Sequence, residues 1–470
     1  MGRPLDEYRA GIKRWLKRGL LSGTGKGIVS GVTDILFFLS FAVCFSWEFI
    51  NTTMFKKGFS DSFELRMDSL YHIVVIIALV CGLIAVLMQE SLYQAVFEAV
   101  LLAAGLLHWK VGGGKYEVFV LCVLIVGMTG RSFRALLTIA FTIGGILMAA
   151  AFAASQLGII EDLVYDGGRH SFGIVYCTDC AAHILFLMMM YVMLRRDELK
   201  IPEYVLLVFA QAIMMMTKAQ SDVACGFLLL AGVLVYRLTR RWRRSAVMKF
   251  LGRLACLSFF LCTAASFIIT LGFNRNDMEL RKKMQYSLIR RLEMNQQALK
   301  NNPFSLFGIK VEEHGFGGRT TNLPNWDKYF FIDCSYIRLF VIGGLLLFVL
   351  ILLMMTYTQL RCFAYRNYGF VFLLALLAVS CLMEHHLMEY FYNVFPLMAF
   401  SGGRFLKETG NYSRKSVRVQ LQEEADPAPG SGQAPSRVEA DPAPEIGADI
   451  LTERDESGPE TRTGIRKHYD

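Results

Sequence analysis

Arginine and histidine side chains beside apolar segments are the residues of this sequence best suited to chemistry on a phosphate-bearing substrate. The planar guanidinium group meets two phosphate oxygens at once and stays charged when water is removed. Arg169 lies in a short glycine-containing stretch and is followed directly by His170, while Arg290, Arg291 and Arg319 lie in a long polar stretch. These residues predict binding of an anionic substrate, and the alternative for each is a charge that faces solvent or lipid headgroups.

Two histidines are candidates for the general base. His314 is the only histidine between residues 273 and 333, and glycines follow it. An imidazole with an ordinary pKa near 6.5 can accept a proton from a sugar hydroxyl at neutral pH. We therefore expect His314 or His170 to act as the base, the alternative for His314 being a surface histidine in a turn.

Asp179 and His183 are four residues apart in an apolar segment, so on a helix they share one face. Ionisable groups inside a membrane span normally face the bundle interior or a wet cavity. The pair predicts the floor of a site beneath Arg169, or else an internal pair that only orients helices. The nearby Cys177-x-x-Cys180 lacks the further ligands that a zinc site needs. No metal site and no cofactor are predicted.

The composition indicates which elements position these residues. The chain has 470 residues, of which 54% are hydrophobic and 19% charged, whereas soluble domains carry about a quarter charged residues. The apolar residues fall in blocks near 20 residues, enough for a helix to cross about 30 Å of hydrocarbon. This excludes a soluble enzyme, a nucleic-acid-binding domain and a disulfide scaffold. It predicts an all-α polytopic membrane protein with about twelve transmembrane helices, near 31–50, 70–88, 92–108, 116–130, 133–157, 174–194, 203–217, 222–236, 254–272, 334–357, 369–385 and 388–400.

The distribution of Lys and Arg predicts the orientation. With both termini in the cytoplasm, the inner segments carry 26 of these residues and the short outer loops carry 7, as the positive-inside rule requires. Between the ninth and tenth spans lies a large outer loop, in which residues 277–299 have the pattern of an amphipathic helix on the membrane surface. The resulting organisation is a basic N-terminus (1–30), nine spans (31–272), the large loop (273–333), three spans (334–405) and a disordered acidic, Pro-rich cytoplasmic tail (406–470).

Two motifs carry a resemblance to a known family. The first is Arg169-His-Ser-Phe-Gly173 with Tyr176-x-Thr178-Asp179 opening a span, and the second is Tyr329-Phe-Phe-Ile-Asp333-x-Ser335-Tyr336 followed by Gly343-Gly344. With the expected topology, they resemble the bacterial repeat-unit polymerases of capsular, exopolysaccharide and O-antigen synthesis, which are relatives of the O-antigen ligases. Related proteins often begin the eighth span with Ser-Arg or Thr-Arg. This sequence has Thr217-Lys218 and then Gln220 there, so Lys218 would replace the arginine as a point charge.

The resemblance implies an inverting, metal-independent glycosyltransferase in the bacterial cytoplasmic membrane. It would join oligosaccharide repeat units linked to undecaprenyl diphosphate on the outer face. Its partners would be that lipid-linked oligosaccharide, membrane lipid, a chain-length regulator and a flippase, without nucleic acid. The expected diphosphate-binding residues are Arg169, Arg290, Arg291, Lys218 and Arg319, and the expected cavity-lining residues are Asp179, His183, Asp333 and Tyr336.

Three alternatives stay open at this point. A ligase would move finished glycan onto another acceptor with the same donor chemistry. A flippase or secondary transporter commonly has repeated halves, of which the sequence has no sign, although it would use Asp179 and His183. A signalling scaffold would depend on the acidic tail.

Overall fold

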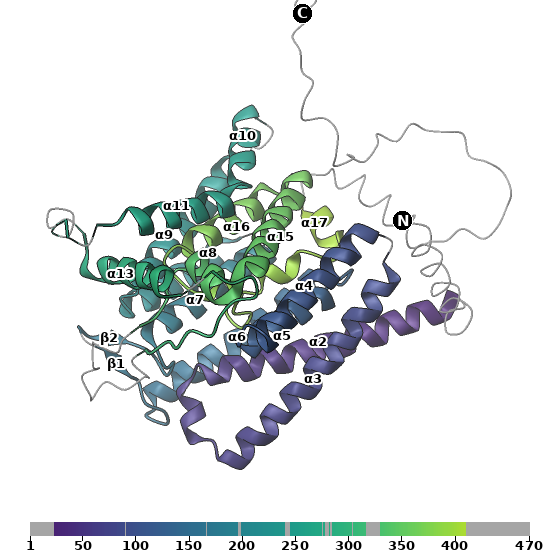
Figure 1. Ribbon diagram of the computed structural model, residues 1–470, viewed down its shortest axis with the longest axis horizontal. Coiled ribbons are helices and arrows are strands. Elements are labelled where there is room, and N and C mark those ends of the chain that lie inside the picture. Colours follow the sequence, from purple (N-terminus) through teal and green to yellow (C-terminus); the bar gives the residue numbers. More distant parts are fainter. Residues whose placement is uncertain are drawn as a thin grey trace, which may run out of the picture. The chain divides into compact units, whose positions relative to one another are not determined.

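The computed structural model describes residues 23–89, 91–165, 167–195, 199–239, 245–274, 276–277, 282, 284–302, 304–315 and 330–409. This part of the chain is almost entirely α-helical and has one two-stranded antiparallel sheet (Figure 1). The expected all-α class is therefore confirmed. The acidic tail from residue 410, most of the basic N-terminus and Arg319 lie outside the described residues.

Seven helices among the described residues are long and apolar enough to cross a membrane. An eighth candidate is the pair α10 (Ala246–Ala255) and α11 (Ser258–Gly272), which is bent by 52° at the break between them. The chain is thus a multi-pass membrane protein. The seven are α2 (Gly23–Asn51), α3 (Asp61–Met88), α4 (Leu92–Lys110), α6 (Phe133–Gln156), α7 (Cys177–Arg195), α9 (Gln220–Leu238) and the continuous run of α14 (Ser335–Arg338), the π-helical turn Leu339–Gly343 and α15 (Gly344–Ala364).

Three expected spans are shorter helices: α5 (Tyr116–Gly127), α8 (Ile201–Met216) and α16 (Tyr368–Ser380). Small polar residues set several of the helix starts. Ser60, Ser91 and Ser132 each accept a hydrogen bond from the backbone N–H three residues on, at the first turns of α3, α4 and α6. α7 is the most buried of the long helices, since it packs against α6, α8 and α9. It is therefore the helix on which a polar side chain is best shielded from lipid.

The expectation of a helix over 388–400 is wrong. After α16 the chain makes only short 3-10 turns, at His386–Met388 and Phe395–Met398. Glu384 bonds to Ser221 and Arg291 of other helices, the two histidines contact Glu389, and Pro396 has no N–H to donate. Backbone bonds tie the two ends of this irregular segment to different parts of the bundle: Ser335 N–H donates to Cys381 O at 3.0 Å, and Gly130 N–H donates to Phe400 O at 3.0 Å.

Side chains satisfy the backbone of this irregular segment. Arg361 donates to the carbonyls of Met398, Ala399 and Ser401, the last at 2.9 Å. Most residues of the segment are buried among the helices. Non-helical backbone at membrane depth is tolerated only where protein covers it and supplies its hydrogen bonds.

The amphipathic helix of the long loop is shorter at its start than expected. α13 spans Tyr286–Asn301, and Asp277 lies outside it. Its apolar side chains Ile289 and Leu292 are buried with Phe273 in a small hydrophobic cluster, and Gln296 donates to the Thr270 and Phe273 carbonyls. The apolar face of α13 therefore packs against the protein, which corrects the expectation that this face rests on lipid.

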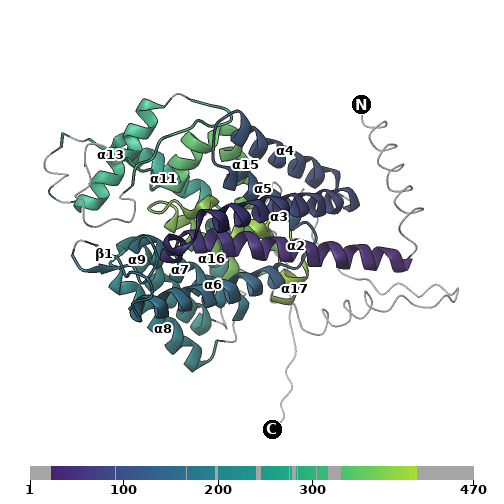
Figure 2. The ribbon, with the colours of Figure 1, turned by 90° about the horizontal axis from the view of Figure 1, so that it is seen from below.

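α13 marks one end of the helical bundle, called the α13 end below. The C-terminal end of α2, the hairpin of β1 (Val164–Tyr165) and β2 (Arg169–His170), and the start of α7 lie at the same end (Figure 2). Thr53 pairs with Ile174 there through backbone hydrogen bonds, which joins α2 to the segment that precedes α7. The short helix α17 (Arg404–Thr409) lies at the opposite end.

Candidate functional site

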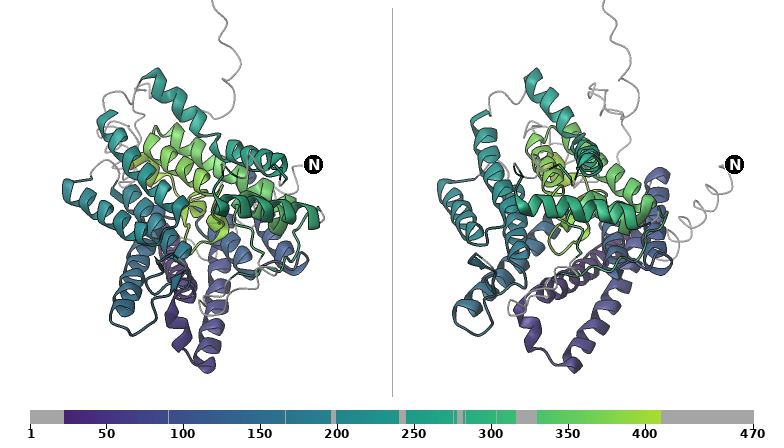
Figure 3. Two further views of the ribbon diagram at one scale, coloured as in Figure 1. Left: turned by 90° about the vertical axis from the view of Figure 1, so that its left-hand side faces the viewer. Right: turned by 60° about the vertical axis from the view of Figure 1, so that its left-hand side comes forward.

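Ionisable and aromatic side chains from five parts of the chain meet inside the bundle near the α13 end, which faces the reader in the left panel of Figure 3. They come from α7, α9, α13, the residues before α14 and the irregular segment. We call them the acid–histidine cluster: Asp179, His183, Asp222, Arg291, Asp333, Glu384, His385, His386, Glu389 and Tyr392. Since lipid cannot solvate such groups, their meeting marks the best candidate for a functional site.

Arg291 connects the long loop to this cluster. Its Nε lies 3.0 Å from Asp333 Oδ2, and its Nη1 lies 3.3 Å from Glu384 Oε1 and 2.5 Å from Met383 O. Burial disfavours the charged guanidinium, but the nearby Glu384 and Asp333 carboxylates favour it more strongly, and the pKa of Arg291 is raised. Burial raises the pKa of Asp333 to about 6 in spite of Arg291. The guanidinium therefore stays charged while this carboxyl group can carry a proton near neutral pH.

Glu389 holds both histidines of the irregular segment. Its Oε2 lies 2.8 Å from His386 Nδ1 and 3.7 Å from His385 Nε2. Ser335 fixes the turn before them, because its hydroxyl donates to Glu384 O at 2.5 Å and accepts from Leu387 N–H at 3.3 Å. The two imidazole rings are thus held by Glu389 of their own segment, and Ser335 of α14 fixes the backbone that carries them.

The rings of the cluster form a continuous stack that ties α2 and α7 to the irregular segment. His183 lies between Phe49 and Tyr392, with ring centroids 4.0 Å from each. Tyr392 is 4.1 Å from His386, which is 4.1 Å from His385. The Thr52 hydroxyl lies 2.9 Å from His183 Nε2, and the Tyr392 hydroxyl bonds to Asp179. Asp179 and His183 therefore both face the bundle interior.

Arg169 and Lys218 lie together in a second group at the α13 end. Arg169 Nε donates to Thr217 O at 3.2 Å, and Lys218 Nζ donates to Gly167 O. Among the described residues, neither forms an ion pair with a carboxylate. His170 follows in the same hairpin, with Nδ1 2.7 Å from Asp162 Oδ2.

The remaining expected site residues are placed as follows. His314 is exposed, and its backbone pairs with that of Phe330. Arg290 lies 3.7 Å from Glu293 on the same helix. Tyr336 is buried and donates to Ala378 O at 2.7 Å, so its hydroxyl is used in joining α14 to α16.

Reasoning from sequence alone did not assign Asp222, Glu384, His385, His386 or Glu389 to the site. The four residues between 384 and 389 were interpreted as interruptions of the last spans. They carried a usable signal, because ionisable residues within an apolar region are costly unless they are functional. The position of Tyr392 had no such signal, since an aromatic residue is ordinary in an apolar segment.

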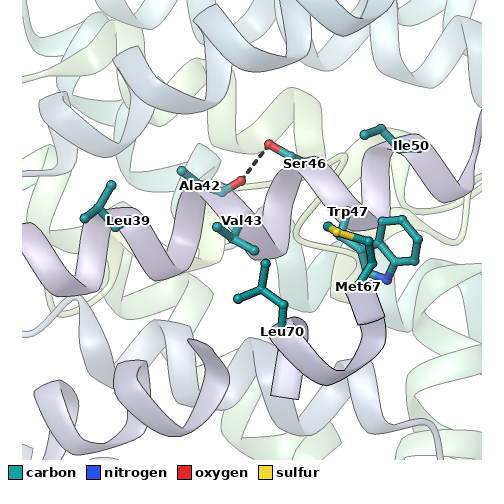
Figure 4. A pocket seen from close by; sticks show the side chains of 8 residues that line it. All are labelled: Leu39, Ala42, Val43, Ser46, Trp47, Ile50, Met67 and Leu70. Atoms are coloured by element: carbon teal, nitrogen blue, oxygen red, sulfur yellow. Dashed lines mark hydrogen bonds between the residues drawn. The ribbon is translucent and has the colours of Figure 1, made fainter. Parts of the chain in front are cut away.

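An apolar groove of about 240 Å³ opens between α2 and α3 (Figure 4). Its one hydroxyl-bearing lining residue, Ser46, donates to Ala42 O at 2.7 Å within α2. The groove suits an aliphatic chain and offers no group for catalysis. It is lined by Leu39, Ala42, Val43, Ser46, Trp47, Ile50, Met67 and Leu70.

Comparisons of this chain with protein-family models, with curated proteins and with solved structures found no match.

Proposed function

We propose that this protein is a membrane glycosyltransferase that polymerises oligosaccharide repeat units linked to undecaprenyl diphosphate, at the outer face of a bacterial cytoplasmic membrane. The observation that carries the proposal is the contact of Arg291 with Asp333 and Glu384. Through it, a cation from the long loop meets carboxylates at the mouth of a helical bundle. The carboxylates can accept hydrogen bonds from the hydroxyls of a sugar, and Arg169 and Lys218 at the same end of the bundle suit a diphosphate.

The proposed topology has twelve crossings. Eight come from the long helices and the bent pair, and α5, α8, α16 and the irregular segment 381–403 supply four more. An even number of crossings returns the chain to the side on which it began. In this proposal both termini are cytoplasmic, and the α13 end faces outward. The Lys and Arg distribution supports this orientation.

The reaction is attack by an acceptor hydroxyl on the anomeric carbon of the donor, with departure of the lipid diphosphate and inversion at that carbon. Cations must stabilise the charge that develops on the leaving group. Arg169 and Lys218 suit this role because no described carboxylate forms an ion pair with them. Arg291, in contrast, already pairs with the carboxylates of Asp333 and Glu384. Arg290 and Arg319 are further candidates in the long loop.

A base must take the hydroxyl proton. His314, which is exposed, and His170, which Asp162 orients, are the two candidates. Asp333 and Glu384 can accept hydrogen bonds from the hydroxyls of the acceptor sugar. The chemistry needs no nucleotide and, with arginine present, no obligatory metal.

The test is reconstitution with a defined lipid-diphosphate oligosaccharide and analysis of the product on a gel. Wild-type protein should give a ladder with steps of one repeat unit. Arg169→Ala and His314→Ala should shorten or abolish the ladder, while Lys57→Ala, at an exposed ion pair with Glu161, should leave it intact. If Arg169→Ala and His314→Ala both give long polymer, these assignments are wrong.

Two other functions share part of this evidence. A ligase would transfer one finished glycan to a different acceptor and give a single new product instead of a ladder. A flippase or transporter would use the interior-facing Asp179 and His183, and labelled lipid would cross the bilayer without elongation.

A further inference from the structure

Two imidazole nitrogens of the acid–histidine cluster are buried without a hydrogen-bond partner among the described residues: His385 Nδ1 and His386 Nε2. His386 is 1% exposed. A buried polar atom without a partner costs about 1–3 kcal/mol. Two such atoms on neighbouring residues indicate that something absent from the chain itself satisfies them.

Glu389 determines which nitrogen of His386 is available. Its carboxylate lies 2.8 Å from Nδ1, so Nδ1 donates to Glu389 and Nε2 is the nitrogen that remains for a ligand. In metal sites, a ligating histidine almost always donates its other N–H to a carboxylate or carbonyl, which fixes the ring and raises its basicity. His386 and Glu389 have this arrangement.

A carboxylate lies within reach of both rings. One ligand atom from each of Glu384, His385 and His386 falls within 4.8 Å of the others, so one ion can contact all three. The bonds that Glu384 accepts from Ser221 and Arg291 both fall on Oε1, so neither of them occupies Oε2.

Carboxyl groups also outnumber guanidinium groups in the cluster, by five to one. One of the carboxyl oxygens, Asp222 Oδ2, is buried without a partner among the described residues, and Asp222 interacts electrostatically with Glu384. A divalent ion at Glu384 would offset the repulsion between these acidic groups.

We propose that Glu384, His385 and His386 bind one divalent transition-metal ion such as Zn²⁺ or Mn²⁺. Imidazole nitrogens favour such ions over Mg²⁺, which prefers oxygen ligands in octahedral geometry. The ion has a structural role: it fixes the conformation of the irregular segment at Glu384, which bonds to Ser221 of α9 and Arg291 of α13. Transfer chemistry by arginine and a base is compatible with this role.

The test is metal binding by the full-length chain, purified in detergent with an affinity tag that contains no histidine. Protein stripped with a chelator is equilibrated with Zn²⁺, desalted and analysed for metal content. We expect about one Zn²⁺ per wild-type chain and none retained after an equal treatment with Mg²⁺. His386→Ala and Glu384→Gln should lose the ion, while His72→Ala, at an exposed histidine of α3, should keep it.

The wild-type protein also provides a measurement that does not depend on the folding of variants. Co²⁺ in the stripped protein should give visible absorption bands of a nitrogen–oxygen site, and added Zn²⁺ should remove them. A wild-type chain that binds neither ion, or a His386→Ala variant that still binds one ion, would overturn the proposal. Neither readout involves glycan transfer, so the metal site and the proposed function can fail separately.

Discussion

Replacement of Arg291 by alanine tests the central contact of the candidate site. The side chain bridges Asp333 and Glu384, whose side chains are 20% and 5% exposed, and also bonds to the Met383 carbonyl. Its removal leaves two carboxylates without their cation. Breaking a buried ion pair costs about 3–5 kcal/mol, and the lower end applies here because Arg291 itself is 22% exposed. We expect Arg291→Ala to destabilise the protein by about 3 kcal/mol.

An exposed lysine of the same helix provides the matched control. Lys300 is on the same helix, and its side chain is exposed. Lys300→Ala should therefore change the stability of the protein by no more than about 0.5 kcal/mol. Both variants remove one positive charge and a long side chain from α13, so the difference between them reports the buried contacts of Arg291.

The assay is unfolding of the purified protein in detergent, followed by the exposure of buried cysteines to a thiol-reactive dye. All eleven cysteines are buried, so dye labelling reports unfolding. A second variant, Arg291→Lys, keeps the positive charge but loses the planar guanidinium group that contacts both carboxylates. Its stability should lie between that of the wild type and that of Arg291→Ala. Equal destabilisation by Lys300→Ala and Arg291→Ala would refute the reasoning that Arg291 joins the loop to the cluster.

Three further predictions concern the ring stack, a carboxyl group and the tail. Tyr392→Phe should cost about 1 kcal/mol because it loses only the hydrogen bonds of the hydroxyl to Asp179 and Thr52, whereas Tyr392→Ala opens the stack and should cost about 3–5 kcal/mol. Equal losses in thermal unfolding would contradict the stack. The pKa of Asp333 is about 6 in the folded protein and about 3.9 in the unfolded chain, so between these pH values the folded state holds an extra proton. Between about pH 4 and 6, the stability of the wild-type protein should therefore fall as the pH rises, relative to that of Asp333→Asn. Parallel pH profiles of the two proteins would contradict this. Deletion of residues 410–470 should leave polymer length on gels unchanged, and a loss of polymer would instead favour the scaffold interpretation.

The sequence by itself determined the class of the protein. Helices of this apolarity must bury their backbone hydrogen bonds internally, so blocks near 20 residues indicate membrane spans without any knowledge of their packing. The period of the sequence also placed Asp179 and His183 on one helical face, because that depends only on local geometry. Asn301 and Pro303 indicated the end of α13 for the same local reason.

Only the tertiary structure decided where the last span breaks and which ionisable residues meet. Glu384 looks like a defect in a helix when only the local sequence is considered, because its partners Arg291 and Ser335 are 93 and 49 residues away in the chain. The irregular backbone is stable only because Arg361 and Ser335 satisfy its carbonyls from other helices. Sequence periodicity reports each element alone, whereas a polar cluster inside a membrane protein is a property of how several elements pack together.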